Sequence, residues 1–125
     1  MIAKTRLTML AACAILSVAT SAVAQEQAWT GEQIKAAWVG KKVFGRSATG
    51  GLIDFHMRAD GTATVATGNL VDSGTWRAIE AGYCATWKKI RAGEERCFKV
   101  VNRNGKVLVL NPDGAIGTEI LNVVD

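Results

Sequence analysis

From about residue 41 onward, apolar and polar side chains alternate, and glycine, asparagine and aspartate interrupt the pattern about every ten residues. An alternation with a period of two indicates β-strands, and the interruptions indicate tight turns. In residues 52–58, for example, Ile53, Phe55 and Met57 would share one face of a strand. The chain is therefore predicted to fold as a mainly β domain.

The pattern divides into about eight short strands joined by local turns. The strongest turn signal is Asn104-Gly105, because both residues tolerate the positive φ of a type I′ hairpin. An open meander would leave two edges unpaired, so a small up-and-down antiparallel β-barrel is favoured over a two-sheet sandwich. The predicted strands are residues 42–46, 52–58, 62–67, 73–80, 83–90, 96–102, 106–110 and 117–122.

A short helix is predicted before the strands. Thr30 is a suitable N-cap, Gln33 completes a capping box, and Trp29 and Ile34 occupy the positions of a hydrophobic staple. Gly40 suits the left-handed residue that ends a helix. We expect this helix to plug or flank one end of the barrel.

Residues 1–24 have the layout of a cleaved signal peptide: a basic start, an apolar run and the small-residue site Ala22-Val23-Ala24. The apolar run is too short to span a bilayer. The weakly positive mean hydropathy of the chain comes largely from this signal, so the mature chain is expected to contain no transmembrane segment. A periplasmic or secreted protein is predicted, with residues 25–125 as its single domain. Lipidation at Cys13, after Leu10-Ala11-Ala12, is the alternative.

Removal of the signal takes away Lys4 and Arg6, so the formal net charge falls from +4 to +2. That charge is too small for an electrostatically driven nucleic-acid binder. The mature chain then keeps two cysteines, Cys84 and Cys97, which should pair in an oxidising compartment. If they face each other on neighbouring strands, the hairpin turns near residues 89–92. A reactive redox pair and a zinc site are weaker alternatives.

No catalytic set or cofactor motif is recognisable. His56 is the one histidine, and it lies on the polar face of a predicted strand, where a solvated role is favoured over a general base. Asp60, Asp72 and Asp113 are interpreted as turn residues. We therefore expect no metal, no cofactor and no enzyme activity.

Two groups of residues are candidates for binding. The first, Trp76, Trp87, Tyr83 and Phe55, would line a pocket for a small apolar or amphipathic ligand, although large aromatic side chains also fill the cores of small barrels. The second, Lys88, Lys89 and Arg91, lies in the hairpin between the two cysteines and would form a basic docking surface. An ordinary solvated hairpin is the alternative for that group.

The segments Gly74-Thr75-Trp76 and Gly82-Tyr83-Cys84, together with Trp87 and Cys97, are similar to a known pattern. On these residues the chain resembles the family of small exported proteobacterial proteins called domain of unknown function 995, over roughly residues 31–114. The resemblance implies a lipocalin-like β fold with one disulfide, and it implies no catalytic residues.

The resulting hypothesis is an exported barrel that acts by binding a small ligand. The alternative is a protein-interaction module, such as an envelope-stress factor or an inhibitor of a secreted hydrolase, that uses the basic hairpin.

Overall fold

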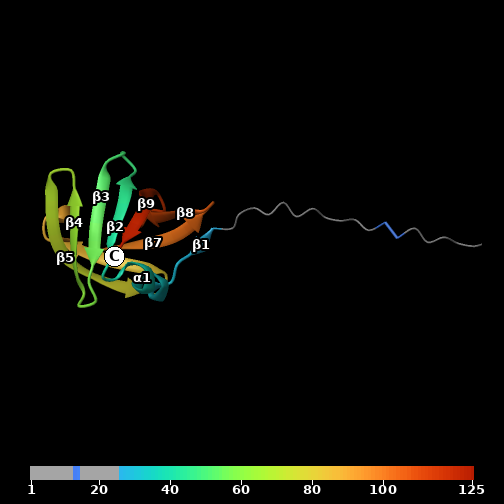
Figure 1. Ribbon diagram of the computed structural model, residues 1–125, viewed down its shortest axis with the longest axis horizontal. Coiled ribbons are helices and arrows are strands. Elements are labelled where there is room, and N and C mark those ends of the chain that lie inside the picture. Colours follow the sequence, from blue (N-terminus) through green and yellow to red (C-terminus); the bar gives the residue numbers. More distant parts are fainter. Residues whose placement is uncertain (1–12, 15–25) are drawn as a thin grey trace, which may run out of the picture.

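The computed structural model describes residues 13–14 and 26–125. Apart from Cys13 and Ala14, the predicted signal peptide and its cleavage site lie outside the described residues, so export stays a prediction. Residues 26–125 form one β-barrel with a short helix at one end (Figure 1).

Eight antiparallel strands, β2 to β9, close into an up-and-down barrel. Each strand pairs with the next along the chain, and β9 pairs with β2 to complete the circle. This confirms the predicted barrel. The strands are β2 (Lys42–Ser47), β3 (Leu52–Met57), β4 (Thr62–Thr67), β5 (Leu70–Ile79), β6 (Gly82–Trp87), β7 (Arg96–Arg103), β8 (Lys106–Leu110) and β9 (Ile116–Val124).

An additional strand, β1 (Gln27–Ala28), was not predicted. It pairs with β7 at residues 101–102, beyond the point where β6 leaves that strand. Two residues are too few to show a hydrophobic period, so only the unpaired edge of β7 explains why this segment is extended.

The inward-facing side chains follow the alternation seen in the sequence. Val43 lies opposite Phe55, and Phe55 lies opposite Val65 on the next strand. All three side chains are buried in the main hydrophobic cluster. Because side chains on a strand point alternately to the two faces, closing the sheet gathers one set inside the barrel.

The helix α1 (Gly31–Trp38) closes one end of the barrel. Thr30 and Gln33 form the predicted capping box, and Ile34 and Trp38 are fully buried. The Trp38 ring packs edge-on against Phe55 inside the barrel, with 5.5 Å between the ring centroids. The helix therefore plugs the barrel rather than flanking it. Among the described residues, no helix has the length and apolar character needed to cross a bilayer.

Two glycines allow β5, β6 and β7 to approach one another closely. A Cβ atom on Gly74 would lie 1.9 Å from the carbonyl oxygen of Thr86, and one on Gly82 would lie 1.9 Å from that of Phe98. Both glycines belong to the segments that carry the family resemblance. A larger residue at either place would force neighbouring strands apart.

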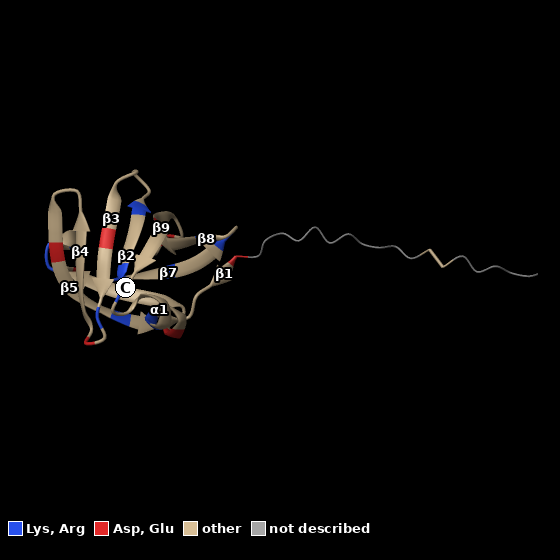
Figure 2. Cartoon of the chain, in the orientation of Figure 1, with Lys and Arg blue, Asp and Glu red and all other residues tan. Residues whose placement is uncertain are grey.

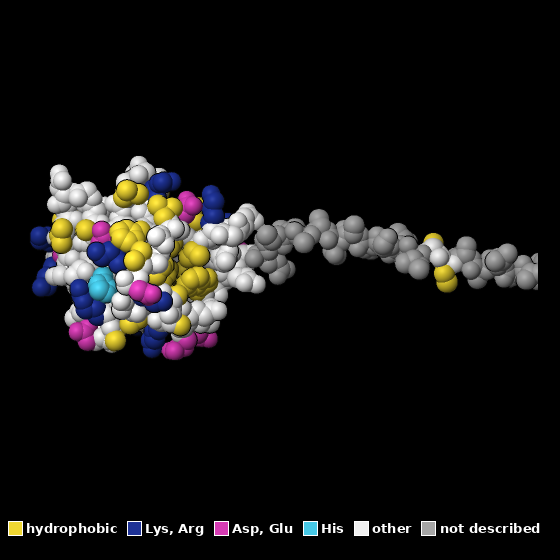
Figure 3. Space-filling view, viewed as in Figure 1, with side chains coloured by type: hydrophobic (Ala, Val, Ile, Leu, Met, Phe, Trp, Pro, Cys, Tyr) yellow, Lys and Arg dark blue, Asp and Glu magenta, His cyan; other side chains and the backbone are white. Residues whose placement is uncertain are grey.

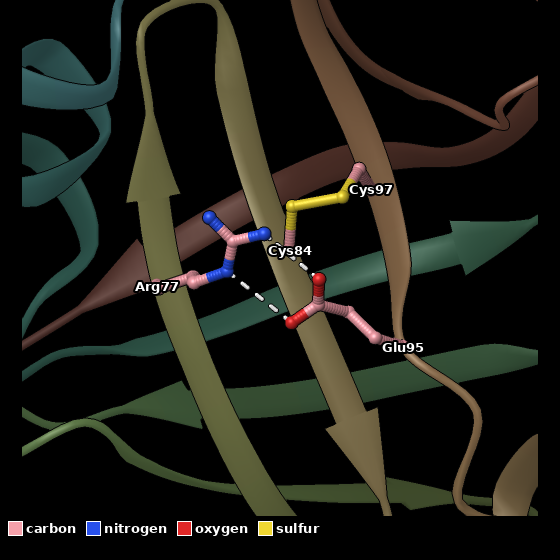
Figure 4. Close-up of a disulfide and its surroundings, with 4 residues drawn as sticks. All are labelled: Arg77, Cys84, Glu95 and Cys97. Carbon is pink, nitrogen blue, oxygen red and sulfur yellow. Dashed lines mark hydrogen bonds and ion pairs between the residues drawn. A yellow bond between two sulfur atoms is a disulfide. The ribbon is translucent and has the colours of Figure 1, made fainter.

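Cys84 and Cys97 form a disulfide between directly opposed positions of β6 and β7, which confirms the predicted pairing. The connection between them turns at the 3₁₀ segment η1 (Ile90–Gly93), as expected. Beside the disulfide, Arg77 on β5 makes a two-point ion pair with Glu95 (Figure 4). The disulfide thus joins β6, which leads into η1, to β7, which leads out of it.

Candidate ligand-binding cavity

A cavity of about 470 Å³ occupies the half of the barrel farther from α1. The β2–β3, β4–β5, β6–β7 and β8–β9 connections meet there, because alternate connections of an up-and-down barrel share one end. Figure 1 shows the first two of these turns at the end opposite α1. Small-molecule sites commonly measure about 300 to 1,000 Å³, so the space is large enough for a ligand.

The cavity wall is largely apolar, and most of its polar side chains lie in the turns at its mouth or on strand residues close to them. Met57 and Val109 contribute to the inner wall, whereas Ser47 is the last residue of β2, and Thr49 and Asn111 come from the β2–β3 and β8–β9 connections. Trp38 fills the other end, with its ring centroid 6.1 Å from that of Tyr83. The barrel is therefore filled beside the helix and hollow beside the turns.

The structure brings three of the four predicted pocket residues together. Phe55, Tyr83 and Trp87 all line the cavity. Trp76 is not among the lining residues: it is buried near the β3–β4 turn, and its indole N–H donates to the carbonyl oxygen of Arg58 at 2.8 Å. For Trp76 the core-filling interpretation is the one that the structure supports.

The predicted basic surface does not hold together as a group. Lys88 and Lys89 are exposed, whereas Arg91 turns toward the cavity, with its guanidinium carbon 5.4 Å from the centroid of the Phe98 ring. Lys and Arg are also interspersed with Asp and Glu over the visible side of the barrel (Figure 2). A single basic docking face is therefore not supported by this arrangement.

Arg91 points inward because of an unusual backbone. Arg91 and Ala92 have φ values of 55° and 51°, in the left-handed region that side chains with a Cβ seldom adopt. The sequence carries no signal for this conformation, since only Gly93 in the same segment is a residue that favours positive φ. The role of Arg91 in the cavity was therefore missed.

Asp72 was interpreted as a turn residue, and that interpretation is wrong. Asp72 lies within β5, where it is 4% exposed, and it accepts hydrogen bonds from the backbone N–H groups of Lys89 (2.9 Å) and Ile90 (2.8 Å). Burial opposes ionisation, but these donors and that of Ser73 outweigh it and hold the pKa of Asp72 below its ordinary value. Asp72 thus fastens the start of η1 to the barrel rim.

The other two aspartates agree with the turn interpretation. Asp60 accepts from the backbone N–H and the hydroxyl of Thr62, and Asp113 accepts from the N–H of Ala115. His56 lies on β3 between Phe55 and Met57, which both line the cavity, so its own side chain faces the outside of the barrel. This position agrees with the predicted polar face.

Aromatic rings form a continuous column from the mouth of the cavity to the helix. Arg91 lies over Phe98, the rings of Phe98 and Tyr83 are 5.3 Å apart, and Tyr83 packs against Trp38. Burial raises the pKa of the Tyr83 hydroxyl far above its usual value, so it stays protonated as a hydrogen-bond donor. The column thus places one cation and one phenolic hydroxyl beside aromatic rings in the cavity.

Comparisons with family models, with curated proteins and with solved structures found no match. The function is therefore argued from the geometry of the cavity.

A second apolar surface lies on the outside of the barrel. Hydrophobic side chains gather over β2, β3 and β9 on the face shown in Figure 3, and a groove there is lined by Phe44, Leu52 and Leu121. Leu52 is 66% exposed. The groove and the cavity share the lining residues Ile53 and Thr67, so the two adjoin at the wall formed by β3 and β4.

Proposed function

We propose that this protein is an exported binding protein that holds a small apolar or amphipathic molecule in the open half of its barrel. The cavity of about 470 Å³ is the observation that carries the proposal. An eight-stranded barrel is just wide enough to be filled by side chains or to hold one small ligand. Here Trp38 fills one end, and the other end is left hollow.

The chemistry of the wall favours binding over catalysis. Among the described residues that line the cavity there is no histidine, cysteine or carboxylate. Hydroxyl groups such as those of Ser47, Thr49 and Tyr83 do line the cavity, but a hydroxyl nucleophile needs an adjacent base to activate it. An apolar wall with a few polar groups is instead the usual lining of a small-molecule site.

Export and family membership are part of the same proposal. A structural disulfide is typical of proteins that fold outside the cytoplasm, so the Cys84–Cys97 bridge supports the predicted signal peptide. Gly74 and Gly82 belong to the segments that resemble this family, and the close approach of neighbouring strands explains why a barrel needs glycine at both positions. These observations support membership of the domain of unknown function 995 family.

Displacement of a neutral fluorescent probe, N-phenylnaphthylamine, would test the binding proposal. The probe should bind the purified disulfide-bonded protein with increased emission, and it should quench Trp87, the one tryptophan among the described lining residues. Trp87→Phe should remove most of the ligand-dependent change in tryptophan fluorescence.

Substitution of two alanines by leucine, one inside the cavity and one outside it, would show where the probe binds. Ala85 lines the cavity and is 3% exposed, whereas Ala66 lies opposite Asp54 and does not line it. Ala85→Leu should weaken probe binding by partly filling the space, and Ala66→Leu should leave it unchanged. Equal effects of the two variants, or no binding by the natural protein, would contradict the proposal.

A further inference from the structure

Arg91 is the one charged side chain among the described residues that line the cavity. It is partly buried, and burial lowers the pKa of its guanidinium, which nevertheless stays protonated because its ordinary value is so high. A cation withdrawn from water is costly unless an anion or hydrogen-bond acceptors compensate for it. Arg91 is only partly buried, and its guanidinium still reaches water, so an anionic ligand in the cavity could replace that water and pair with the guanidinium.

Within residues 26–125, no anionic partner for Arg91 is supplied by the protein. The salt bridges of this part of the chain join other residues, and no side-chain hydrogen bond of Arg91 is present there. Glu94 is the carboxylate whose charge acts on Arg91, but the two make no ion pair, and the carboxylate of Asp72 already accepts from three backbone N–H groups. The π face of Phe98 is the one favourable contact that the geometry shows for the guanidinium.

Tyr83 provides a second unused polar group. Its hydroxyl has no hydrogen-bond partner among the described residues, and its ring packs against Phe98, which lies beneath Arg91. The charge on Arg91 acts on this hydroxyl, so the two groups share one region of the cavity. Together they offer several N–H donors and one O–H donor to an acceptor in the cavity.

The backbone that carries Arg91 is held in place by specific contacts. Its left-handed conformation is unfavourable for a residue with a Cβ, and such conformations persist where surrounding contacts determine them. Those contacts come from Asp72, which binds the two backbone N–H groups immediately before Arg91. The cation is thus positioned in advance, as binding sites require.

We propose that the ligand is a single-chain carboxylate amphiphile, whose carboxylate pairs with Arg91 and accepts a hydrogen bond from Tyr83 while its apolar chain occupies the aromatic interior. This inference rests on the proposed function. A planar guanidinium binds a carboxylate through two parallel hydrogen bonds, and the surrounding apolar wall strengthens that pairing.

Three ligands of equal chain length test the inference: dodecanoate, dodecanol and dodecylammonium, each measured by displacement of N-phenylnaphthylamine. Dodecanoate should bind most tightly and dodecylammonium least. Arg91→Gln should weaken dodecanoate by about tenfold or more, as expected for loss of hydrogen bonds to a charged group, and should leave dodecanol unchanged. Tyr83→Phe should have a smaller effect in the same direction.

Lys88→Gln is the matched control, because it removes the same charge from an exposed neighbouring position outside the cavity. It should leave the binding of all three ligands unchanged. Circular dichroism and thermal unfolding of each variant check that the barrel is intact. If an intact Arg91→Gln variant binds dodecanoate as well as the natural protein, or if dodecanol binds as tightly as dodecanoate, the inference is overturned and the binding function stands. If neither the probe nor any of the three ligands binds, the binding function itself is overturned.

Discussion

The carboxylate of Asp72 accepts a hydrogen bond from the backbone N–H of Ile90, 18 residues further along the chain, at 2.8 Å. The same oxygen accepts from the N–H of Lys89 at 2.9 Å. These bonds tie β5 to the connection between β6 and β7, directly before Arg91. One buried side chain therefore controls both the shape of the cavity mouth and the position of its cation.

Asp72→Asn should loosen the η1 segment. The two carboxylate oxygens accept from Ser73 on one side and from Lys89 and Ile90 on the other. An asparagine has one oxygen, so its NH₂ group would face one of these sets of backbone N–H donors and leave it unpaired. We expect a lower Tm and a several-fold weaker binding of N-phenylnaphthylamine. Asp113→Asn removes a carboxylate from an exposed turn and is the control. Equal effects of the two substitutions would show that Asp72 has no special role.

Acid should release the same contact. The pKa of Asp72 is held below its ordinary value of 3.8, so its ionised form contributes stability above that pH, and the contribution is lost as the pH falls through the folded-state pKa. The Tm of the natural protein should therefore drop below about pH 4. The Tm of the Asp72→Asn variant should fall less over that range, as differential scanning fluorimetry in a pH series would show. Asp60 and Glu95 also have a lowered pKa and remain in the variant, so both proteins should lose some stability in acid. If the Tm of the natural protein and that of the variant fell equally with pH, the loss would not come from Asp72.

The disulfide should contribute substantially to stability. Its cysteines are 13 residues apart. Closing a loop of that length reduces the entropy of the unfolded chain, which stabilises the folded state by about 3 kcal/mol. Cys84→Ala with Cys97→Ala should lower the free energy of unfolding by about this amount, measured by urea denaturation. A reducing agent should destabilise the natural protein and leave the double variant unchanged. A natural protein insensitive to full reduction would refute the expectation.

Gly74→Ala should destabilise the sheet, because the new Cβ would lie 1.9 Å from the carbonyl oxygen of Thr86. Overpacking of this kind typically costs about 1 to 3 kcal/mol. Gly51→Ala is the matched control, since its Cβ would meet Ser47 Oγ at an ordinary 3.5 Å. Thermal unfolding of both variants is the measurement, and the prediction fails if the two Tm values are equal.

Local patterns predicted much of the fold. The alternation in residues 52–58, the Asn104-Gly105 hairpin and the capping box at Thr30 each involve neighbours in sequence, and each appears in the structure. The pairing of Cys84 with Cys97 was also predicted from the sequence, because they are the two cysteines that remain after removal of the predicted signal peptide, and the turn expected between them agrees with it. In each case, the residues that signal a feature are the residues that form it.

The sequence by itself determined an eight-stranded barrel with one helix and one disulfide, because hydrophobic periodicity, turn chemistry and helix capping act over a few residues. Only the tertiary structure decided that one half of the interior is hollow, since that volume depends on how side chains from all the strands meet once the sheet closes. It also decided that Arg91 faces inward and Trp76 does not line the cavity. Those outcomes follow from a left-handed backbone at Arg91 and from hydrogen bonds that Asp72 and Trp76 make with residues 18 positions away.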